Sequence, residues 1–168
     1  MSKPEIIMIC AVDNNMGIGK DNDMLFYISE DLKRFKQLTS GQAVVMGRKC
    51  WESLPKRPLP NRENIVMTTN TDYKCEGGIL ANSVEQVLAM TKDTDKVFII
   101  GGAQIYKLFM PYATSLLITE IDNSSKDADV FFPDIDMNVW KIADKSEINT
   151  DANQVRYRYV NFKKRADS

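Results

Sequence analysis

Three largely apolar stretches constrain the fold of this 168-residue chain most strongly. They span 5–12, 42–47 and 96–100, and polar residues or glycine close each one before a helical pattern begins. Short apolar runs without alternation are typical of strands buried on both faces, as in a parallel sheet covered by helices. The sequence therefore predicts an α/β fold in which strands and helices follow one another.

The rest of the sequence predicts further helices and strands, and the last strands differ from the first ones. The predicted helices span 29–38, 48–54, 83–90 and 103–109, and the additional strands span 64–69, 77–81, 115–121, 140–148 and 155–162. The last three strands are long and separated by loops, which suggests an antiparallel end to the sheet. We expect one three-layer α-β-α domain over residues 1–168, with a core from 5 to 163 and a tail from 164 to 168. Its central twisted sheet has eight mostly parallel strands with an antiparallel C-terminal strand, and about four helices flank it.

Composition narrows the chemistry. The chain contains no histidine, which excludes a Ser-His-Asp triad, a Cys-His dyad and a His-ligated zinc site. Catalysis would then depend on carboxylates, tyrosine, lysine or a bound cofactor. The three cysteines are far apart in the sequence and form no Cys-x-x-Cys motif, which fits a reducing compartment.

Charge and hydropathy bear on partners and location. The 22 Lys and Arg residues nearly balance 23 Asp and Glu residues, so nothing in the charge favours nucleic acid as a partner. A basic tail at 163–165 is expected to be solvated, with RNA contact as the alternative. The apolar run 6–12 is too short to span a membrane and lacks the features of an export signal. We therefore expect a cytoplasmic protein without a membrane partner.

An acidic residue at the start of the first predicted helix has two interpretations. Ser29 suits the N-cap position, and Glu30 and Asp31 follow it in the first turn. The apolar stripe of this helix consists of Leu32, Phe35 and Leu38. Asp31 either serves the helix dipole or is a carboxylate in an apolar pocket that grips a polar ligand and supplies protons.

Two glycine-containing turns favour anion binding. Gly47 precedes a helix whose first turn carries Arg48 and Lys49, which indicates an anion site, although a solvated basic turn remains the alternative. Gly101 and Gly102 precede the helix 103–109 and would let a pyrophosphate approach the backbone, or serve helix–sheet packing alone. The Gly-rich and Asn-rich stretch 16–23 is predicted to be a mobile loop, and it is not a P-loop.

Several motifs stand in one order along the chain. They are 11–13 before a Gly-rich loop, Glu30-Asp31-Leu32-x-x-Phe35-Lys36, Met46-Gly47-Arg48-x-x-Trp51-Glu52-Ser53, Arg57-Pro58-Leu59-Pro60-x-Arg62, Ile99-Ile100-Gly101-Gly102-x-x-Ile105-Tyr106, Thr119-Glu120-Ile121-Asp122 and Phe131-Phe132-Pro133. Together they resemble the dihydrofolate reductase family of the monomeric bacterial type, over residues 5–163. The resemblance implies an NADPH-dependent oxidoreductase that reduces 7,8-dihydrofolate to 5,6,7,8-tetrahydrofolate in support of one-carbon metabolism, without a metal. It further implies a monomer that binds dihydrofolate and antifolate-type small molecules.

The resemblance also implies roles for particular residues. Asp31 would hold the pterin N–H and 2-amino groups, with Thr119 hydrogen-bonded to it. Arg62 would clamp the glutamate α-carboxylate of the substrate. The implied catalytic residues are Asp31, Thr119 and Phe26. The implied substrate-binding residues are Ile7, Met8, Asp31, Leu32, Phe35, Lys36, Leu54, Leu59, Arg62, Ile100, Tyr106 and Thr119.

For the cofactor, residues 16–24 would be a lid with Ile18 beside the nicotinamide. Arg48, Thr69 and Asn70 would take the 2′-phosphate. Lys49, Cys50 and the helix start at 101–105 would hold the pyrophosphate, and the peptide between Gly101 and Gly102 would be cis. The implied cofactor-binding residues are Ile9, Ile18, Gly19, Asn22, Gly47, Arg48, Lys49, Cys50, Thr68, Thr69, Asn70, Ile100, Gly101, Gly102, Ala103, Gln104 and Ile105.

The chain departs from the family pattern in two places. The run 25–29 lacks the tryptophan and both prolines that usually precede the acidic residue, with Phe26 in the aromatic position. Gln104 stands where many members carry arginine, which places more weight on Arg48. Two rival hypotheses remain: the related pyrimidine reductase of riboflavin synthesis, and an inactive pteridine-binding regulatory protein.

Overall fold

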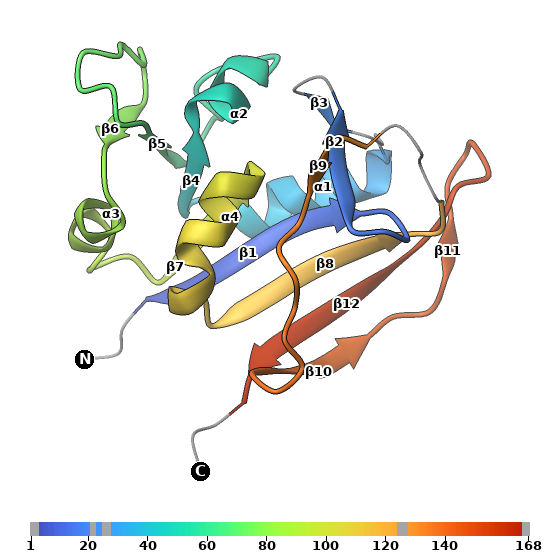
Figure 1. Cartoon of the computed structure of the whole chain (residues 1–168). Helices are drawn as coiled ribbons and strands as arrows, with labels where there is room; N and C mark the ends of the chain where they lie inside the picture. The colour runs from blue at the N-terminus through green and yellow to red at the C-terminus, as the bar shows by residue number, and fades with distance from the viewer. Residues whose placement is uncertain (1–3, 21–22, 25–27, 124–127, 166–168) are drawn as a thin grey trace.

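The computed structural model describes residues 4–20, 23–24, 28–123 and 128–165, and a twisted sheet runs through its centre (Figure 1). The path of eight strands is β10-β12-β8-β1-β7-β4-β5-β6, and a short β11 pairs beside β12. The strands of this sheet are β1 (Glu5–Val12), β4 (Ala43–Gly47), β5 (Glu63–Met67), β6 (Ile79–Ala81), β7 (Lys96–Gly101), β8 (Ser115–Ile121), β10 (Trp140–Lys145), β11 (Asn149–Thr150) and β12 (Arg156–Lys164). The pairs from β8 to β6 are parallel, and β12 is antiparallel to both of its neighbours along the path. The predicted architecture is confirmed.

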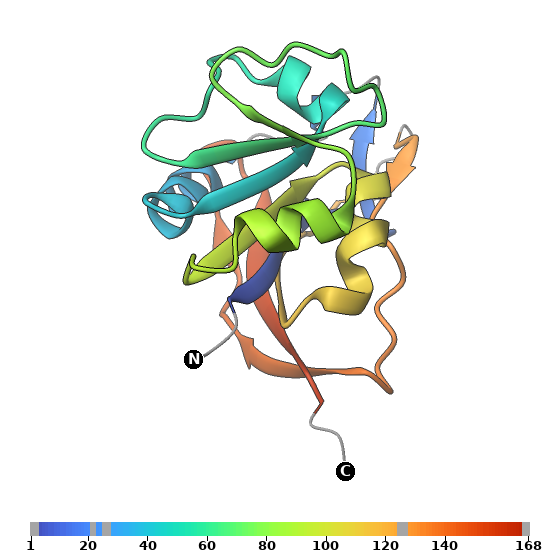
Figure 2. The ribbon, with the colours of Figure 1, turned by 90° about the vertical axis from the view of Figure 1, so that its left-hand side faces the viewer.

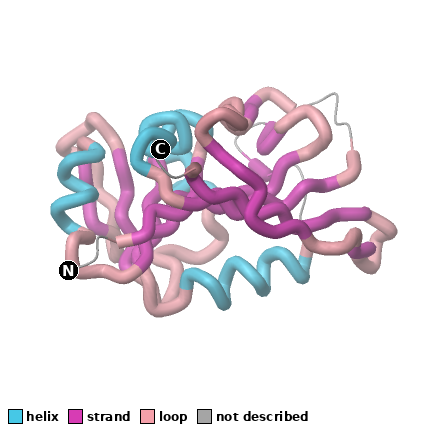
Figure 3. The backbone as a smooth tube through the Cα atoms, turned by 90° about the horizontal axis from the view of Figure 1, so that it is seen from below, coloured by secondary structure: helices cyan, strands magenta, loops and turns pink. Residues whose placement is uncertain are grey.

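Helices cover both faces of the sheet (Figure 3). The helices are α1 (Ser29–Thr39), α2 (Arg48–Ser53), α3 (Val84–Met90) and α4 (Ala103–Phe109), with a 3₁₀ turn at Met110–Tyr112. One apolar cluster joins the sheet to α3 and α4, which cover the same face (Figure 2). A second cluster joins the other face to α1 and α2. Strands β1, β4 and β7 are largely apolar because both of their faces are buried in this way.

The prediction of a loop over 16–23 is wrong in part, because residues 17–20 and 23 belong to a second sheet. Strands β2 (Gly17–Lys20) and β3 (Asp23–Met24) pair with each other, and β2 also pairs with β9 (Val130–Phe131). Asp13 fixes the turn before β2, since its Oδ1 accepts hydrogen bonds from the backbone N–H groups of Gly17 at 2.7 Å and Asn15 at 2.8 Å. The backbone N–H of Phe132 donates to the carbonyl of Met16 at 2.8 Å.

Several element boundaries differ from the predictions. The Ser29 N-cap is wrong, because Ile28 takes that position without a side-chain cap and Ser29 is already helical. The apolar stripe is wrong at Leu32, which is 41% exposed. The predicted strand 140–148 ends at Lys145 as β10, with a register shift between Ile142 and Asp144, and the short β11 follows at Asn149–Thr150. The Ser83 cap is confirmed, since its hydroxyl accepts from the Gln86 N–H at 3.1 Å.

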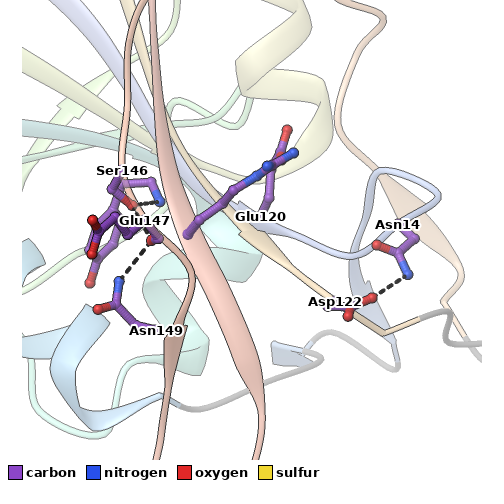
Figure 4. Close-up of polar contacts among 8 residues, drawn as sticks. Asn14, Glu120, Asp122, Ser146, Glu147 and Asn149 are labelled. Carbon is purple, nitrogen blue, oxygen red and sulfur yellow. Dashed lines mark hydrogen bonds and ion pairs between the residues drawn. The ribbon is translucent and has the colours of Figure 1, made fainter.

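Polar contacts tie the carboxyl ends of β1 and β8 to their surroundings (Figure 4). Asn14 Nδ2, just after β1, donates to Asp122 Oδ1, just after β8, at 3.3 Å. Arg158 Nε on β12 donates to Glu120 Oε1 on β8 at 2.8 Å. These contacts hold the strand ends together beside Thr119. Across the described ranges, no helix has both the length and the apolar character needed to span a membrane.

Candidate active site

Asp31 lies where α1 begins, close to the carboxyl ends of β1 and β8. Thr119 on β8 donates its hydroxyl hydrogen to Asp31 Oδ1 at 2.7 Å, which confirms the predicted contact. Burial raises the pKa of Asp31 above its ordinary value, while the hydrogen bond from Thr119 and the positive charge of Arg34 act in the opposite direction. A carboxylate that only served the helix dipole in solvent would have no such desolvation, so the geometry favours the pocket interpretation.

The apolar residues predicted to pack the substrate gather beside this carboxylate. Phe35, Leu54, Leu59 and Ile100 are partly buried and pack in one cluster with Ile7, between α1 and α2. The exposed Leu32 and Lys36 lie on the same helix as Asp31. Partial burial is expected of side chains that line an open pocket rather than a closed core.

The side chains of two predicted substrate contacts, Met8 and Tyr106, pack in the other apolar cluster, with α3 and α4. Met8 is fully buried with the α3 and α4 cluster, on the opposite face of β1 from Ile7 and Ile9. Because successive side chains of a strand point to opposite faces, the side chain of Met8 faces away from that of Ile7. A substrate contact of Met8 stays a prediction. The hydroxyl of Tyr106 donates to the Ile9 carbonyl at 2.7 Å, beneath Gly101. Its contact with a substrate stays a prediction.

Arg62 lies at the other end of α1. Its Nη1 donates to Thr39 Oγ1 at 3.0 Å, its Nε donates to the Pro60 carbonyl at 2.9 Å, and its Cζ lies 5.9 Å from the ring centroid of Phe35. Burial lowers the pKa of Arg62. Asp31 and Thr39 are eight positions apart on the helix, which corresponds to about 12 Å along its axis. One ligand could therefore meet a carboxylate at one end and a guanidinium at the other.

The loop that carries Arg62 is organised by a residue that the sequence reasoning missed. The buried side chain of Asn64 accepts from the Leu59 N–H at 2.8 Å and donates to the carbonyls of Leu59 and Arg62, each at 2.9 Å. An asparagine at the start of a strand carries no local signal for this role, because its partners depend on the path of the loop.

Two helix starts lie next to each other at the predicted cofactor site. The register pairs Met46 with Gly101, so the ends of β4 and β7 are adjacent and α2 and α4 begin side by side. The predicted cis peptide between Gly101 and Gly102 is confirmed. A Cβ on Gly47 would lie 3.1 Å from Ile105, whereas one on Gly102 would meet no atom of the described residues within 4 Å. Gly47 thus serves close packing, and Gly102 leaves the start of α4 accessible.

Arg48 is the first residue of α2, and it forms an ion pair with Glu52. Its Nη1 lies 2.9 Å from Glu52 Oε1, and the Tyr73 hydroxyl donates to Glu52 Oε2 at 2.8 Å. The hydrogen bond from Tyr73 is the main cause that lowers the pKa of Glu52, and Arg48 adds to it. Glu52 and Tyr73 therefore orient the guanidinium near the end of β5.

The other predicted cofactor contacts are distributed around these helix starts. The register pairs Gly47 with Met67, which brings Thr68, Thr69 and Asn70 next to the first turn of α2. Lys49 and Cys50 follow Arg48 in α2, and Ala103 and Gln104 begin α4. Ile18 and Gly19 lie on β2, and Ile18 packs on the core. Phe26 and Asn22 lie outside the described residues.

The thiols near this region are not nucleophiles. Burial raises the pKa of Cys10 to about 12 and that of Cys50 to about 11. Both thiols are therefore protonated at neutral pH, and nucleophilic cysteine chemistry is excluded for them.

A polar hollow of about 500 Å³ lies at the opposite edge of the sheet. Its lining includes Gln42, Arg62, Glu63 and Asp95, near the amino ends of β4, β5 and β7. Open α/β sheets bind ligands at the carboxyl ends of their strands, where Asp31 and the helix starts are found. We therefore place the candidate active site at that edge and not in this hollow.

Comparisons with known proteins point to one family. The family model for dihydrofolate reductase matches residues 5–164. The chain is 44% identical over 158 residues to the dihydrofolate reductase of Neisseria meningitidis serogroup B, covering 94% of this chain and 97% of the relative. It is 38% identical over 164 residues to that of Bacillus subtilis, covering 97% and 96%. A solved dihydrofolate reductase from Enterococcus faecalis, complexed with NADP(H) and RAB-propyl, matches with a TM-score of 0.88 and 32% identity, covering 96% of this chain and 97% of that one.

Proposed function

The chain belongs to the dihydrofolate reductase family, and on this premise we propose that it reduces 7,8-dihydrofolate to 5,6,7,8-tetrahydrofolate with NADPH. The observation that carries the proposal is the partly buried Asp31, hydrogen-bonded to Thr119 beside the apolar cluster of α1 and α2. The family assignment does not favour the pyrimidine reductase or the inactive binding protein. A monomeric state and a cytoplasmic location belong to the same proposal.

Asp31 binds and polarises the pterin. Its carboxylate accepts hydrogen bonds from the ring N–H and the 2-amino group, and Thr119 fixes its orientation. The negative charge favours a protonated pterin, so that N5 acquires a proton through water while C6 accepts the hydride. The apolar side chains around the ring lower the local dielectric and strengthen this effect.

Arg62 binds the far end of the substrate. Its guanidinium lies at the end of α1 away from Asp31 and is held by Thr39 and Pro60. A bidentate contact with the glutamate α-carboxylate would fix the substrate along the helix, since the planar fork of arginine matches a carboxylate.

The residues at the two helix starts fit a phosphate-bearing cofactor. Gly102 leaves room for a close approach, both helices point their amino ends the same way from neighbouring strands, and Arg48 supplies a positive charge. NADPH, when bound there, supplies the hydride. Arg48 would bind its 2′-phosphate, and residues 101–105 its pyrophosphate.

One assay tests the proposal directly. Protein mixed with NADPH and dihydrofolate should oxidise the nicotinamide, which is followed as a fall in absorbance. The absence of any dihydrofolate-dependent oxidation would contradict the proposed activity.

Replacement of Arg48 should separate the two nicotinamide cofactors. Arg48→Ala removes a charge-assisted contact of roughly 1.5–3 kcal/mol, which corresponds to about a 10- to 150-fold higher KM for NADPH. NADH lacks the 2′-phosphate and should be nearly unaffected. The matched control is Arg57→Ala, which removes a cation whose Cζ lies 5.7 Å from the Trp51 ring on the same helix. Equal weakening of both cofactors would place Arg48 on the shared pyrophosphate.

Replacement of Arg62 should affect only substrates that carry glutamate. Arg62→Lys keeps the charge but loses the bidentate fork, so KM for dihydrofolate should rise about tenfold. The KM of a dihydropteridine without the glutamate should stay the same, because it makes no contact with Arg62. Parallel kinetics on the two substrates check this, and an equal change for both would assign Arg62 to loop structure.

A further inference from the structure

Arg34 lies one turn beyond Asp31 on α1 and has no place in the chemistry described above. Its Cζ lies 4.0 Å from the ring centroid of Tyr159 on β12, a close cation–π distance. Its Nη1 is buried and has no hydrogen-bond partner among the described residues. Asn161 Oδ1, two residues further along β12 and on the same face as Tyr159, is likewise buried without a partner.

The Tyr159 ring, on which Arg34 stacks, lies near the carboxylate of Asp31. Tyr159 pairs with Thr119 across the neighbouring strands, and Thr119 donates its hydrogen bond to Asp31. The guanidinium and the carboxylate also lie on the same helix at positions i and i+3, which face the same side. Stacking on Tyr159 thus holds a positive charge near Asp31.

The stability of the fold does not explain an arginine at this position. A buried N–H of a charged group without a partner destabilises the fold, and the contact with Tyr159 offsets only part of that cost. A methionine would fill similar space without a buried charge. The remaining effect of the guanidinium is electrostatic, and its nearest consequence is on Asp31.

We propose that Arg34 is a positioning residue that acts through Asp31: its charge keeps the carboxylate ionised and weakens the negative field that the pterin experiences. This inference deepens the proposed function and rests on it. A nearby cation stabilises the anionic carboxylate, and because it is positively charged it also disfavours the protonated pterin. Arg34 therefore lowers the rate of hydride transfer at alkaline pH relative to the rate at acidic pH.

The other titratable groups that face Asp31 do not supply this charge. Burial raises the pKa of Cys10 on β1 to about 12 and that of Tyr159 to about 12, and it also raises the pKa of Tyr157 on β12. These groups are neutral at the pH of catalysis. Glu30 on α1 has a side chain that is 61% exposed and lies 3.8 Å from Lys33. Arg34 is therefore the cation that acts on the carboxylate from within the packed structure.

The first test measures the carboxylate itself and does not depend on activity. Carbon-13 NMR of the side-chain carboxyl groups, with Asp31 assigned by its loss in Asp31→Asn, gives the titration midpoint in the free protein. The midpoint should rise in Arg34→Met and Arg34→Gln and stay near that of the parent protein in Arg34→Lys. Lys33→Met is the matched control, because it removes a cation from the same helix at a side chain that is 71% exposed. An unchanged midpoint in both neutral variants would overturn the proposal.

The second test follows the pH dependence of hydride transfer in a single turnover. The rate at about pH 9 relative to that at about pH 6 should increase roughly threefold to tenfold in Arg34→Met, with Arg34→Lys close to the parent protein. Arg34→Gln gives the same comparison with a neutral polar side chain. A lower rate at every pH with an unchanged profile would make Arg34 structural and overturn the inference. A protein that titrates as expected but lacks any dihydrofolate reduction would contradict the proposed function alone.

Discussion

Asp31→Asn should slow hydride transfer by a factor on the order of 10²–10⁴ near neutral pH, the range typical of acid–base groups. The amide preserves the shape of the carboxylate and its contact with Thr119, but it carries no charge to favour a protonated pterin. The loss should shrink at low pH, where the solvent can protonate the substrate directly. Single-turnover rates measured from acidic to mildly alkaline pH check this expectation.

The stability of the same variant separates the two interpretations of Asp31. Burial raises the pKa of Asp31, so the folded state binds its proton more tightly than the unfolded chain does. The carboxyl group then favours folding at pH below its unfolded pKa and loses that contribution as pH rises through its folded pKa. Asp31→Asn should therefore preserve or increase the free energy of unfolding at neutral pH. An acid that only served the helix dipole would instead cost up to about 1 kcal/mol when neutralised.

The matched control for this variant is Glu30→Gln. Glu30 lies in the same helical turn, but its side chain is 61% exposed. Its neutralisation should leave the hydride-transfer rate nearly unchanged at every pH. Equal rates for Asp31→Asn and the parent protein over the whole range would return Asp31 to the dipole interpretation.

The main sheet could be predicted because its strands are buried on both faces. The stretches 5–12, 42–47 and 96–100 became β1, β4 and β7 with small changes at their ends. The small sheet of β2, β3 and β9 could not be predicted in this way. Its strands are two to four residues long, and the pairing of β2 with β9 joins segments more than 100 residues apart. Such pairing depends on tertiary placement and leaves little periodicity in the sequence.

In the candidate site too, some residues could be predicted from the sequence and others could not. Asp31, Thr119 and the glycines of 101–102 stood in recognisable motifs, and the structure brings the first two into contact. Asn64 and Arg34 were missed because their partners lie in the fold and not in a local pattern. The family pattern gives a whole stretch of β1, whereas alternation along the strand turns the side chain of Met8 to the opposite face from Ile7 and Ile9.

Asp13→Ala should lower the free energy of unfolding by roughly 2–5 kcal/mol, because it removes a shared acceptor from two backbone donors. Asp13 is 3% exposed, and its Oδ1 accepts from Gly17 and Asn15 at 2.7 and 2.8 Å. The space around it is already filled, since a Cβ on Gly17 would lie 2.9 Å from the Asp13 carboxylate. Denaturant unfolding measures the loss. Asp13→Asn keeps an acceptor oxygen at the same place and should retain most of the stability.

The same variant tests whether β2 takes part in the reaction. If β2 is the lid that shields the nicotinamide side from water, its displacement in Asp13→Ala should also slow hydride transfer per folded molecule. The control is Asp122→Ala. It removes a long hydrogen bond of 3.3 Å to Asn14 and an exposed ion pair of 3.7 Å with Arg156, and it should cost less than about 1 kcal/mol. Asp13→Ala that is destabilised but transfers hydride at the parent rate would show that the turn after β1 supports the fold alone. A loss in both measurements would connect Asp13, through Gly17 and β2, to the chemistry at Asp31.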